Sequence, residues 1–451
     1  MRVAYLCTDF GIPVHGSKGA AIHVRELSQA LHNQGHEVAV FAARAGEPTT
    51  PGYDIPVHEI APEPPERRCY DLLRADPAAG EAAAKEIRGL LHAADFRHRV
   101  APRLHAFAAD LIYERYSLLG TAGLSLAHEL AIPLILEVNA PLSDEQAAHR
   151  GLHFAATARA LEREIVSAAD HVIAVSRPLA EWLIACGVAP ERVSILPNGV
   201  DVDRFAAGAA RRNEIRARLG IAPNQAVVGF VGTLKAWHGT ANLIRAVAAL
   251  RHGGVAPSLL IVGEGPQRAE LTALAAAEEI AAATTFTGAV GHDEMPGYLA
   301  AMDVAVAPYD AAPNFYFSPL KLFEYLAAGR PVVAAAIGQV AECVAAGETG
   351  LLYPPGDVAA LAAAIESIVA DPSRAASLGR AGQAYVRAHH TWAGNARAVA
   401  DLVRTAPPTP QSWGETTNDA AQSSPRVGDA ASSPPKVGGP GGPSAEAREA
   451  A

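Results

Sequence analysis

The sequence contains few cysteines, and they lie far apart. Its 451 residues include four, at Cys7, Cys69, Cys186 and Cys343, and no two of them form a CxxC pair. This scarcity argues against a zinc ribbon and against a disulfide framework, and it is typical of a reducing compartment.

The sequence also has no excess of positive charge. Lys and Arg together number 37 against 47 Asp and Glu, which gives a formal net charge of −10 at pH 7. A chain with this balance offers no overall basic field to a nucleic acid. Any phosphate that it binds has to be held by local groups, and we expect no nucleic-acid partner.

Long apolar runs are absent as well. Glu129, Glu137, Glu264 and Glu342 interrupt the most apolar stretches before any reaches the roughly 18 residues of a membrane helix. The first residues, MRVAYLCTDFG, carry one Arg and a short apolar run stopped by Asp9, which favours a buried strand over a signal peptide. We therefore expect a cytoplasmic protein.

What the sequence does contain is enough apolar material for a large core, because hydrophobic residues make up 50% of it. Short apolar runs alternate with helical patterns, which predicts an α/β fold with parallel sheets. In one helix Val24, Leu27 and Leu31 mark the buried face, and Gly35 can end it. The strand-like runs are RVAYLCTD, HEVAVFAA, DLIYERY, IPLILEVN and HVIAVS, then AVVGFVG, SLLIVGEG, TTFTGAV, DVAVAPY and PVVAAA.

The pattern restarts after a turn-rich segment, VSILPNGVDVDRF, which predicts two doubly wound domains that face each other across a cleft. We place the first at residues 1–200 and the second at 201–385, followed by a last ordered helix over 386–405. The stretch 406–451 is rich in Pro, Gly and Ser and has almost no large apolar residues, so we expect a disordered tail.

Two loops that follow predicted strands have the composition of phosphate-binding loops. After the first strand, Gly16 and Gly19 leave room for close backbone approach, and the helix that begins near Ala20 offers unpaired N–H groups. In the second half, Lys235 follows a strand and can pair with a diphosphate as a point charge. A plain strand-to-helix turn and a solvated loop lysine are the alternatives.

The segment SPLKLFEYLAAGRPVV carries the most informative pattern. Ser318 can cap a helix whose first residue is Pro319. The backbone N–H groups of Leu320 and Lys321 are then free for a phosphate, and the lysine adds positive charge without a metal. Glu324 can accept two hydroxyl hydrogen bonds, such as those of a ribose, or it is an ordinary surface-helix glutamate.

In order and spacing these motifs resemble the retaining GT-B glycosyltransferases of family 4 over roughly residues 1–400. The strings that carry the resemblance are GSKGAAIHVRELSQALHNQGHEV, ILPNGVDVDRF, VGEGPQR, SPLKLFEYLAAGRPVVA and ETGLLYPPGD. The resemblance implies two Rossmann-like domains, of which residues 1–200 hold mainly the acceptor and residues 201–385 mainly a nucleotide-sugar donor. It also implies that the helix at 386–405, around Trp392 to Leu402, crosses back to the first domain.

The resemblance further assigns residues on the donor side. It implies that Gly16 and Gly19 lie beside the donor phosphates and that Glu324 binds the donor ribose. It implies that the segment FTGAVGHDEM, around Val290 to His292, lies where the backbone holds the nucleobase, with Val290 and Gly291 as the candidate contacts.

Three positions depart from the family's pattern. Tyr316 stands where the first glutamate of a Glu-x7-Glu motif contacts the donor sugar, and Thr233 and His238 stand in place of an Arg and Lys pair near the diphosphate. Lys235 and Lys321 are the available substitutes, so we predict that these two residues supply the catalytic positive charge. Whether the departures alter or abolish activity is left open.

On the first domain, Glu137 and Asn139 follow a strand after which the family often has a histidine. With Arg115 and Tyr116 at the end of the preceding strand, they are the predicted acceptor-side residues. A role in supporting the core is the alternative for Arg115 and Tyr116.

The resemblance implies a hexosyltransferase-type reaction to a hydroxyl of a polysaccharide, a lipid-linked glycan or a small molecule. In the expected retaining reaction the acceptor attacks on the face from which the diphosphate leaves, and helix N–H groups and lysines stabilise that leaving group. We expect no protein nucleophile, cofactor or metal to be needed.

Two other functions stay open at this point, a nucleotide-sugar epimerase of GT-B fold and a non-catalytic nucleotide-sugar-binding protein. The basic stretch from Arg67 to Arg103 also leaves two interpretations, a weak peripheral contact with the inner membrane face or a solvated surface.

Overall fold

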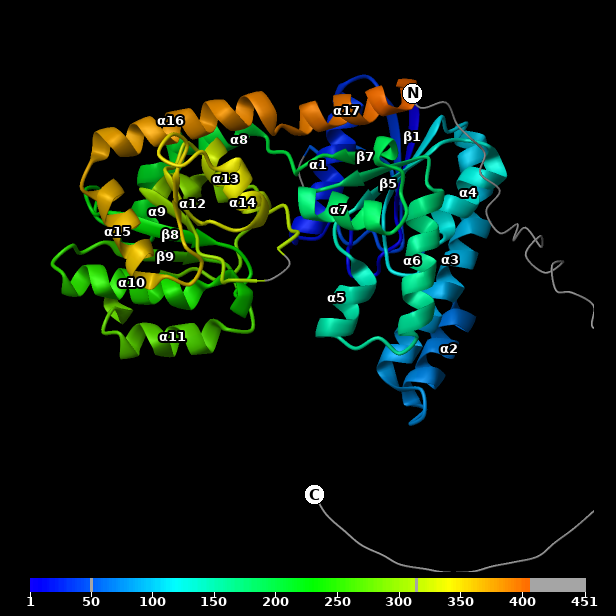
Figure 1. Ribbon diagram of the computed structural model, residues 1–451, viewed down its shortest axis with the longest axis horizontal. Coiled ribbons are helices and arrows are strands. Elements are labelled where there is room, and N and C mark those ends of the chain that lie inside the picture. Colours follow the sequence, from blue (N-terminus) through cyan, green and yellow to red (C-terminus); the bar gives the residue numbers. More distant parts are fainter. Residues whose placement is uncertain (49–51, 313–314, 406–451) are drawn as a thin grey trace, which may run out of the picture. The chain divides into compact units, whose positions relative to one another are not determined.

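Two parallel β-sheets, one in each half of the chain, organise the molecule (Figure 1). The computed structural model describes residues 1–48, 52–312 and 315–405, and the predicted tail over 406–451 lies outside these described residues. The first sheet has seven strands in the order β3-β2-β1-β4-β5-β6-β7, and the second has six in the order β10-β9-β8-β11-β12-β13. All the strand pairings are parallel, as predicted for an α/β fold.

Helices connect the strands in both halves. The elements of the first half are β1 (Arg2–Cys7), α1 (Gly19–Asn33), β2 (Glu37–Ala42), β3 (Val57–Glu59), α2 (Pro64–Ala75), α3 (Gly80–Phe107), β4 (Leu111–Arg115), α4 (Ala122–Leu130), β5 (Leu134–Val138), α5 (Leu142–His149), α6 (Ala155–Ala168), β6 (His171–Ala174), α7 (Arg177–Ala185), η1 (Pro190–Arg192) and β7 (Val193–Ile195). Those of the second half are α8 (Val202–Ala207), η2 (Gly208–Arg211), α9 (Arg212–Arg218), β8 (Val227–Val231), η3 (Ala236–His238), α10 (Thr240–His252), β9 (Ser258–Val262), α11 (Arg268–Ala277), η4 (Ala281–Ala283), β10 (Thr284–Phe286), α12 (Met295–Ala301), β11 (Val304–Ala307), α13 (Leu320–Ala327), β12 (Val332–Ala335), α14 (Gly338–Cys343), β13 (Leu351–Tyr353), α15 (Val358–Val369), α16 (Pro372–His389) and α17 (Trp392–Thr405).

All ten predicted strand runs contain strands, and α1 has the predicted buried face of Val24, Leu27 and Leu31. Three strands were not predicted: β3, β7 and β13, each three residues long at an edge of its sheet. Their residues are mostly only half-buried or exposed, so they leave no continuous apolar run in the sequence.

The two predicted phosphate loops follow the strands at which the strand order of each sheet reverses. β1 lies between β2 and β4, and β8 lies between β9 and β11, so in each sheet the order reverses at these strands. In open α/β sheets, ligands bind beyond the carboxyl ends of the strands at such a switch point. The loops after β1 and β8 begin there.

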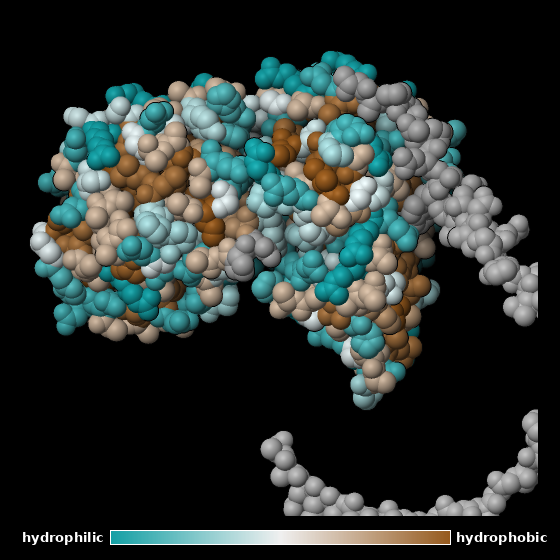
Figure 2. All heavy atoms as spheres, in the orientation of Figure 1, coloured by the Kyte–Doolittle hydropathy of each residue, from teal (hydrophilic) through white to brown (hydrophobic). Residues whose placement is uncertain are grey.

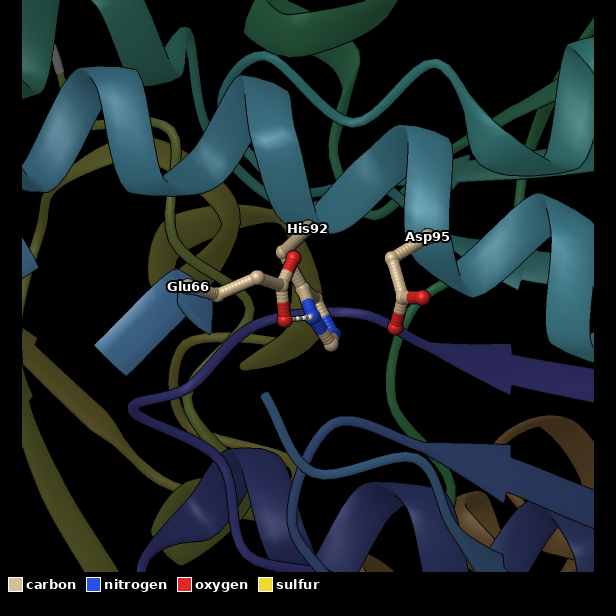
Figure 3. A group of neighbouring side chains, drawn as sticks. All are labelled: Glu66, His92 and Asp95. Carbon is tan, nitrogen blue, oxygen red and sulfur yellow. Dashed lines mark ion pairs between the residues drawn. The ribbon is translucent and has the colours of Figure 1, made fainter. Parts of the chain in front are cut away.

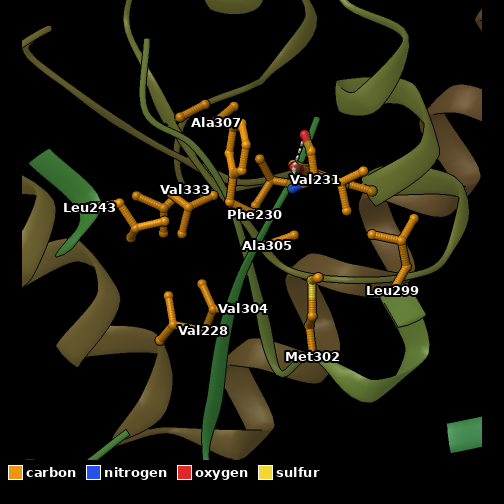
Figure 4. Close-up of a cluster of buried hydrophobic side chains, with 14 of the residues drawn as sticks. Val228, Phe230, Val231, Leu243, Leu299, Met302, Val304, Ala305, Ala307 and Val333 are labelled. Carbon is orange, nitrogen blue, oxygen red and sulfur yellow. Dashed lines mark hydrogen bonds between the residues drawn. The ribbon is translucent and has the colours of Figure 1, made fainter. Parts of the chain in front are cut away.

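Each sheet has its own hydrophobic core. In the second, Val228 and Phe230 of β8 pack with Val304 of β11 and with Met302 (Figure 4). A Cβ at Gly229 would come within 2.2 Å of the Met302 sulfur, so only glycine allows this close contact. The first core contains Val3, Tyr5 and Cys7 of β1 and side chains of α1.

The last helix packs against the first sheet's core, although it follows the second sheet in the sequence. Trp392, Ala396 and Val399 of α17 belong to that core, and α17 lies beside α1 (Figure 1, orange and blue). The chain crosses at Gly199, where a Cβ would come within 2.5 Å of the Trp392 backbone nitrogen. The predicted boundary between the two domains, at residue 200, lies at this crossing. The predicted end of the second domain, at residue 385, lies inside α16. Both domain boundaries stay predictions.

Among residues 1–48, 52–312 and 315–405, no helix combines the length and the apolar character needed to cross a bilayer.

A buried carboxyl group on β4 makes the stability of the first sheet depend on pH. Glu114 is 0% exposed, and neither of its carboxyl oxygens has a hydrogen-bond partner among the described residues. Burial raises the pKa of Glu114 from 4.5 to about 8, and the backbone of Gly123 opposes this only in part. The protonated form is therefore the one that fits the fold at neutral pH.

We predict that Glu114→Gln becomes increasingly stable relative to the wild type as the pH rises from 4.5 to about 8. Over that range the unfolded wild type releases a proton that the folded state keeps, so the wild-type free energy of unfolding falls, whereas glutamine has no such proton. Urea unfolding of both proteins across this range measures the effect. A constant difference between them would show that Glu114 has an ordinary pKa in the fold.

Candidate functional site

The glycine loop after β1 meets the first residue of α13. A Cβ at Gly19 would lie 3.2 Å from Leu320 Cδ1, and Leu320 packs against the first sheet's core. At Gly16, a Cβ would come within 2.9 Å of the Pro13 carbonyl oxygen. Since the first backbone N–H groups of a helix have no partner inside it, the starts of α1 and α13 bring two sets of such donors to one place.

Helix α13 begins one residue later than predicted. Pro319 occupies the N-cap position, so the prediction of Ser318 as the cap and Pro319 as the first helical residue is wrong. The Ser318 hydroxyl instead accepts a hydrogen bond from the backbone N–H of Asn198 at 2.9 Å, and its carbonyl accepts one from Asn198 Nδ2 at 2.5 Å. These bonds hold the residue outside the helix.

Lys321 lies on the first turn of α13 with its ammonium group buried. Its Nζ has no hydrogen-bond partner among the described residues and lies 4.3 Å from the centre of the Phe230 ring and 5.4 Å from that of Tyr309. A Cβ at Gly232 would be 2.5 Å from Nζ, so the glycine after β8 makes room for the charge. Burial lowers the pKa of Lys321 to about 7, although Glu324 opposes the shift.

Lys235 is exposed in the loop after β8, with Nζ 5.9 Å from the Trp237 ring. His238 in the same loop is buried and hydrogen-bonded to the Thr233 carbonyl through Nδ1. Burial, and then the charge of Lys321, lower the pKa of His238 to about 2, so it is neutral at physiological pH. The two lysines are therefore the cations that this region offers to an anion.

A hydrogen bond joins Glu324 to the predicted nucleobase segment. His292 Nε2 lies 2.9 Å from Glu324 Oε1, and both side chains are largely buried. Val290 packs partly against the second core, and Gly291 is exposed. The structure thus connects the carboxylate predicted to hold a ribose to the segment predicted to hold the base.

On the first sheet, Glu137 at the end of β5 is a buried carboxylate with four hydrogen-bond partners. It accepts from His23 Nε2 at 2.6 Å, from Arg115 Nη1 at 2.8 Å, from Asn139 Nδ2 at 2.5 Å and from the Tyr113 hydroxyl. Burial alone would raise the pKa of Glu137, but His23, Arg115 and Tyr113 outweigh it and lower the pKa to about 2.

The structure thus brings three of the four predicted acceptor-side residues, Arg115, Glu137 and Asn139, into one cluster and leaves Tyr116 out of it. Tyr116 is 5% exposed, and burial raises the pKa of its hydroxyl well above its usual value. These features fit the core-supporting alternative for Tyr116.

The Glu137 cluster continues through His23 to the start of α13. His23 Nδ1 lies 2.7 Å from Asn198 Oδ1, and Asn198 in turn makes both bonds to Ser318. A continuous line of hydrogen bonds therefore runs from β5 through α1 and the crossing segment to the residue before Pro319. It fixes the helix that carries Lys321 and Glu324 to the first sheet.

Tyr316 also contacts the first half of the chain. Its hydroxyl donates to Glu145 Oε2 at 3.0 Å, and its carbonyl accepts from the Ser176 hydroxyl at 2.7 Å. Glu145 borders a cavity of ≈ 190 Å³ at the carboxyl ends of β1 and β4. Other residues that line it are Thr8, Asp9, Phe10, Ser117 and Arg150.

Sequence reasoning missed three residues that hold this site together: His23, Arg25 and Asn198. His292 belongs to the predicted nucleobase segment, but its bond to Glu324 was not predicted. Arg25 Nη1 donates to the carbonyls of Val14 and Gly16 and so fixes the glycine loop. His23 lies on the buried face of α1 together with Leu27. Because a buried polar side chain needs a hydrogen-bond partner, a histidine in this position was the signal from which the sequence could have identified His23. No local pattern marked Arg25 or Asn198 as a site residue.

Known protein families match both halves of the chain. Residues 17–204 match the family model described as Glycosyltransferase Family 4, and residues 225–371 match the model described as Glycosyl transferases group 1. The two matches contain the glycine loop end at Gly19 and the α13 segment, respectively.

Individual relatives cover most of the chain. The glycogen synthase of Mycobacterium tuberculosis (strain CDC 1551 / Oshkosh) is 27% identical over 418 residues, which are 89% of this chain and 94% of the relative. A D-inositol 3-phosphate glycosyltransferase of Pseudarthrobacter chlorophenolicus is 29% identical over 387 residues, which cover 83% and 86% of the two chains. The crystal structure of Anabaena HepE in complex with UDP and glucose has the same fold, with a TM-score of 0.69, 21% identity and coverage of 89% and 99%.

We predict that Glu137→Gln lowers the free energy of unfolding most above pH 4.5, and that the loss shrinks as the pH falls toward about 2. In that interval the unfolded wild type takes up a proton before the folded state does, so the stabilisation by the paired carboxylate disappears. Glu114→Gln is the matched control, because the same substitution on the neighbouring strand has the opposite pH dependence. If the free energy of unfolding of Glu137→Gln stayed below that of the wild type by a constant amount down to pH 2, the carboxylate would not be the stabilising partner of His23 and Arg115.

Proposed function

The chain is a GT-B glycosyltransferase of family 4, and we propose that it transfers a sugar from a nucleotide-sugar donor to a hydroxyl acceptor with retention of anomeric configuration and without a metal. The observation that carries the proposal is the buried ammonium of Lys321, which lies without a hydrogen-bond partner among the described residues beside Gly232. A buried cation of this kind calls for an anionic ligand. A donor diphosphate beside the start of α13 supplies one.

The donor is held by groups that come from both halves of the chain. The diphosphate receives hydrogen bonds from the N–H groups at the starts of α1 and α13 and positive charge from Lys321 and Lys235. One oxygen of Glu324 is paired with His292, and the other is left to accept from ribose hydroxyls. The backbone at Val290 and Gly291 contacts the nucleobase.

Transfer needs stabilisation of the negative charge that grows on the departing diphosphate. Preorganised N–H groups and a buried ammonium act most strongly where water is excluded, and they need no proton transfer of their own. The acceptor hydroxyl then attacks the anomeric carbon on the face from which the diphosphate leaves, and it gives its proton to the leaving phosphate oxygen. No protein nucleophile or metal takes part in this step.

The acceptor binds in the cavity beside β1 and β4. Asp9 and Glu145 offer carboxylate oxygens to sugar hydroxyls, and Phe10 offers a ring edge or face. Tyr316 links this cavity to the donor side through its bond to Glu145. It stands where the family resemblance implies a glutamate, and we propose that it orders the acceptor cavity in place of contacting the donor sugar.

The comparisons support a sugar nucleotide and a carbohydrate acceptor. The Anabaena structure contains UDP and glucose, and the relatives are named for glycogen synthesis and for transfer to D-inositol 3-phosphate. For this chain we propose a nucleoside diphosphate sugar as donor and a polysaccharide, a lipid-linked glycan or a small polyol as acceptor.

A donor and acceptor panel tests the proposed reaction. We expect one nucleotide sugar to raise the melting temperature and to give product only with an acceptor, with the donor's anomeric configuration kept in the NMR spectrum of the product. Added Mg²⁺ or Mn²⁺ should leave the rate unchanged. An inverted product would refute the same-face mechanism, and product formed from the donor alone would indicate an epimerase.

Lys321 should control nucleotide binding. We predict that Lys321→Met weakens UDP binding by about 10- to 100-fold, the range expected for one charged hydrogen bond. Wild-type affinity should fall as the pH rises through about 7, because the free lysine loses its proton there, and this dependence should vanish in the variant. Calorimetric titration with UDP from pH 6 to 8.5 measures both effects.

Two lysine variants serve as controls for this titration. Lys235→Met should weaken UDP binding less, because its exposed charge is screened by water. Lys85→Met on α3 should leave UDP binding unchanged, since Lys85 pairs with Glu81 and lines the proposed acceptor cavity, not the proposed donor site. The assignment of Lys321 fails if Lys321→Met binds UDP like Lys85→Met does.

Asn198 should act as a positioning residue. We predict that Asn198→Ala lowers kcat by about 100-fold with a smaller change in UDP affinity, because the start of α13 is then no longer held in position against the first sheet. Asn395→Ala is the matched control: Asn395 is 5% exposed against 8% for Asn198, and its Nδ2 donates to the Pro197 carbonyl at 2.8 Å. Similar kcat losses in both variants would indicate a general loss of stability.

The cytoplasmic location and the peripheral contact with the inner membrane face stay predictions. Leu72 on α2 and Leu90 and Leu91 on α3 are exposed, and Figure 2 shows apolar surface over the region of α2 and α3. Exposed leucines within the basic stretch Arg67 to Arg103 support the contact, since apolar and basic groups together favour an anionic bilayer surface.

A further inference from the structure

The buried imidazole of His92 on α3 contacts the rings of Phe10 and Phe96 but has no hydrogen-bond partner among the described residues. It is 2% exposed, and neither ring nitrogen makes a hydrogen bond to any described residue. Both ring nitrogens are thus free of hydrogen bonds to the described residues, and a neutral imidazole can offer the lone pair of one of them to a ligand. A buried polar group left in this state is costly unless something binds it.

Two carboxylates lie next to this imidazole. Glu66 Oε2 on α2 is 3.9 Å from His92 Nδ1, and Asp95 follows His92 by one turn of α3. One ligand atom from each of the three residues lies within 4.8 Å of both others. Figure 3 shows the Glu66 carboxylate beside the ring and Asp95 projecting from α3 on the same side.

The hydrogen bonds that Asp95 and Glu66 accept each use only one of the two carboxylate oxygens. Asp95 accepts from Arg99 Nη1 through Oδ2 at 2.9 Å, and Glu66 accepts from the Glu63 backbone N–H through Oε2 at 2.9 Å. Each retains a second oxygen. Arg99 also lies 4.0 Å from Glu63, so two carboxylates share its guanidinium. Glu63, Glu66 and Asp95 outnumber the two arginines whose charges act on His92, Arg88 and Arg99, so the cluster keeps an excess of negative charge.

We propose that Glu66, His92 and Asp95 bind a divalent transition-metal ion, Zn²⁺ foremost. One imidazole nitrogen with two carboxylate oxygens suits Zn²⁺, whereas Mg²⁺ and Ca²⁺ prefer oxygen ligands alone. Zinc bonds of about 2.0–2.2 Å place neighbouring ligand atoms roughly 3.4 Å apart. Rotation of the Glu66 and Asp95 side chains closes the remaining gap.

The ion would join α2 to α3. His92 and Gly89 of α3 line the ≈ 190 Å³ cavity beside β1 and β4, so the ion would fix the helix that forms one wall of it. None of its ligands belongs to α13, to the loop after β8 or to the glycine loop. The ion is therefore structural and takes no part in the transfer step, and the proposal does not rest on the proposed function.

Calorimetric titration of the chelator-treated full chain with ZnCl₂ tests the site. We expect one ion more per wild-type chain than per His92→Gln chain, and a weaker effect of MgCl₂. Glu66→Gln should weaken Zn²⁺ binding by about 100-fold or more, yet its amide oxygen can still cap α2. His105→Gln is the matched control, because His105 is exposed on the same helix.

Thermal unfolding separates loss of the ion from loss of the fold. Zn²⁺ should raise the melting temperature of the wild type and of His105→Gln, and raise it little in His92→Gln and Glu66→Gln. UDP binding should be the same with and without chelator, so failure of the metal site and failure of the proposed donor site are distinguishable. Equal Zn²⁺ stoichiometry in wild type and both ligand variants, or tighter binding of Mg²⁺ than of Zn²⁺, would overturn the proposal.

Discussion

The buried carboxylate of Glu137 is the constraint on which the arrangement of the two halves depends. A charge with 1% of its side chain exposed is tolerable only if it is paired and hydrogen-bonded, and here His23, Arg115, Asn139 and Tyr113 do this together. Once His23 is fixed by Glu137, its other nitrogen holds Asn198, and Asn198 holds Ser318. The start of α13 is thereby tied to the first sheet.

The neighbouring strands β4 and β5 carry two buried glutamates, Glu114 and Glu137, whose pKa values are shifted in opposite directions. Glu137 keeps its charge because charged and hydrogen-bonding side chains surround it, whereas Glu114 on the adjacent strand has only the backbone of Gly123 beside it and keeps its proton, with pKa values of about 2 and about 8. Lys321 is a third case, since its buried ammonium has no hydrogen-bond partner among the described residues and its pKa falls to about 7. A ligand diphosphate would complete that last interaction, and for this reason the proposed donor site is centred on Lys321.

Much of the fold could be predicted because its signals are local. The strands of the two sheets' interiors are continuous apolar runs, and α1 shows its buried face in Val24, Leu27 and Leu31. The short edge strands β3, β7 and β13 have no such pattern. The start of α13 was misplaced by one residue because Ser318, a good cap by composition, is held by Asn198, which is 120 residues away in the sequence.

The sequence by itself determined the α/β architecture, the glycine-containing and lysine-containing loops after two of the strands and the presence of Lys321 and Glu324 on one helix, because periodicity and loop composition act over a few residues. The strand order of the structure then placed those two loops at the switch points of the sheets. Only the tertiary structure decided that Lys321 is buried beside Gly232, that Glu324 is paired with His292 and that Tyr316 reaches Glu145. It also decided that His92 lies between Glu66 and Asp95. Burial and charge pairing depend on which distant segments come together, and no local pattern encodes that choice.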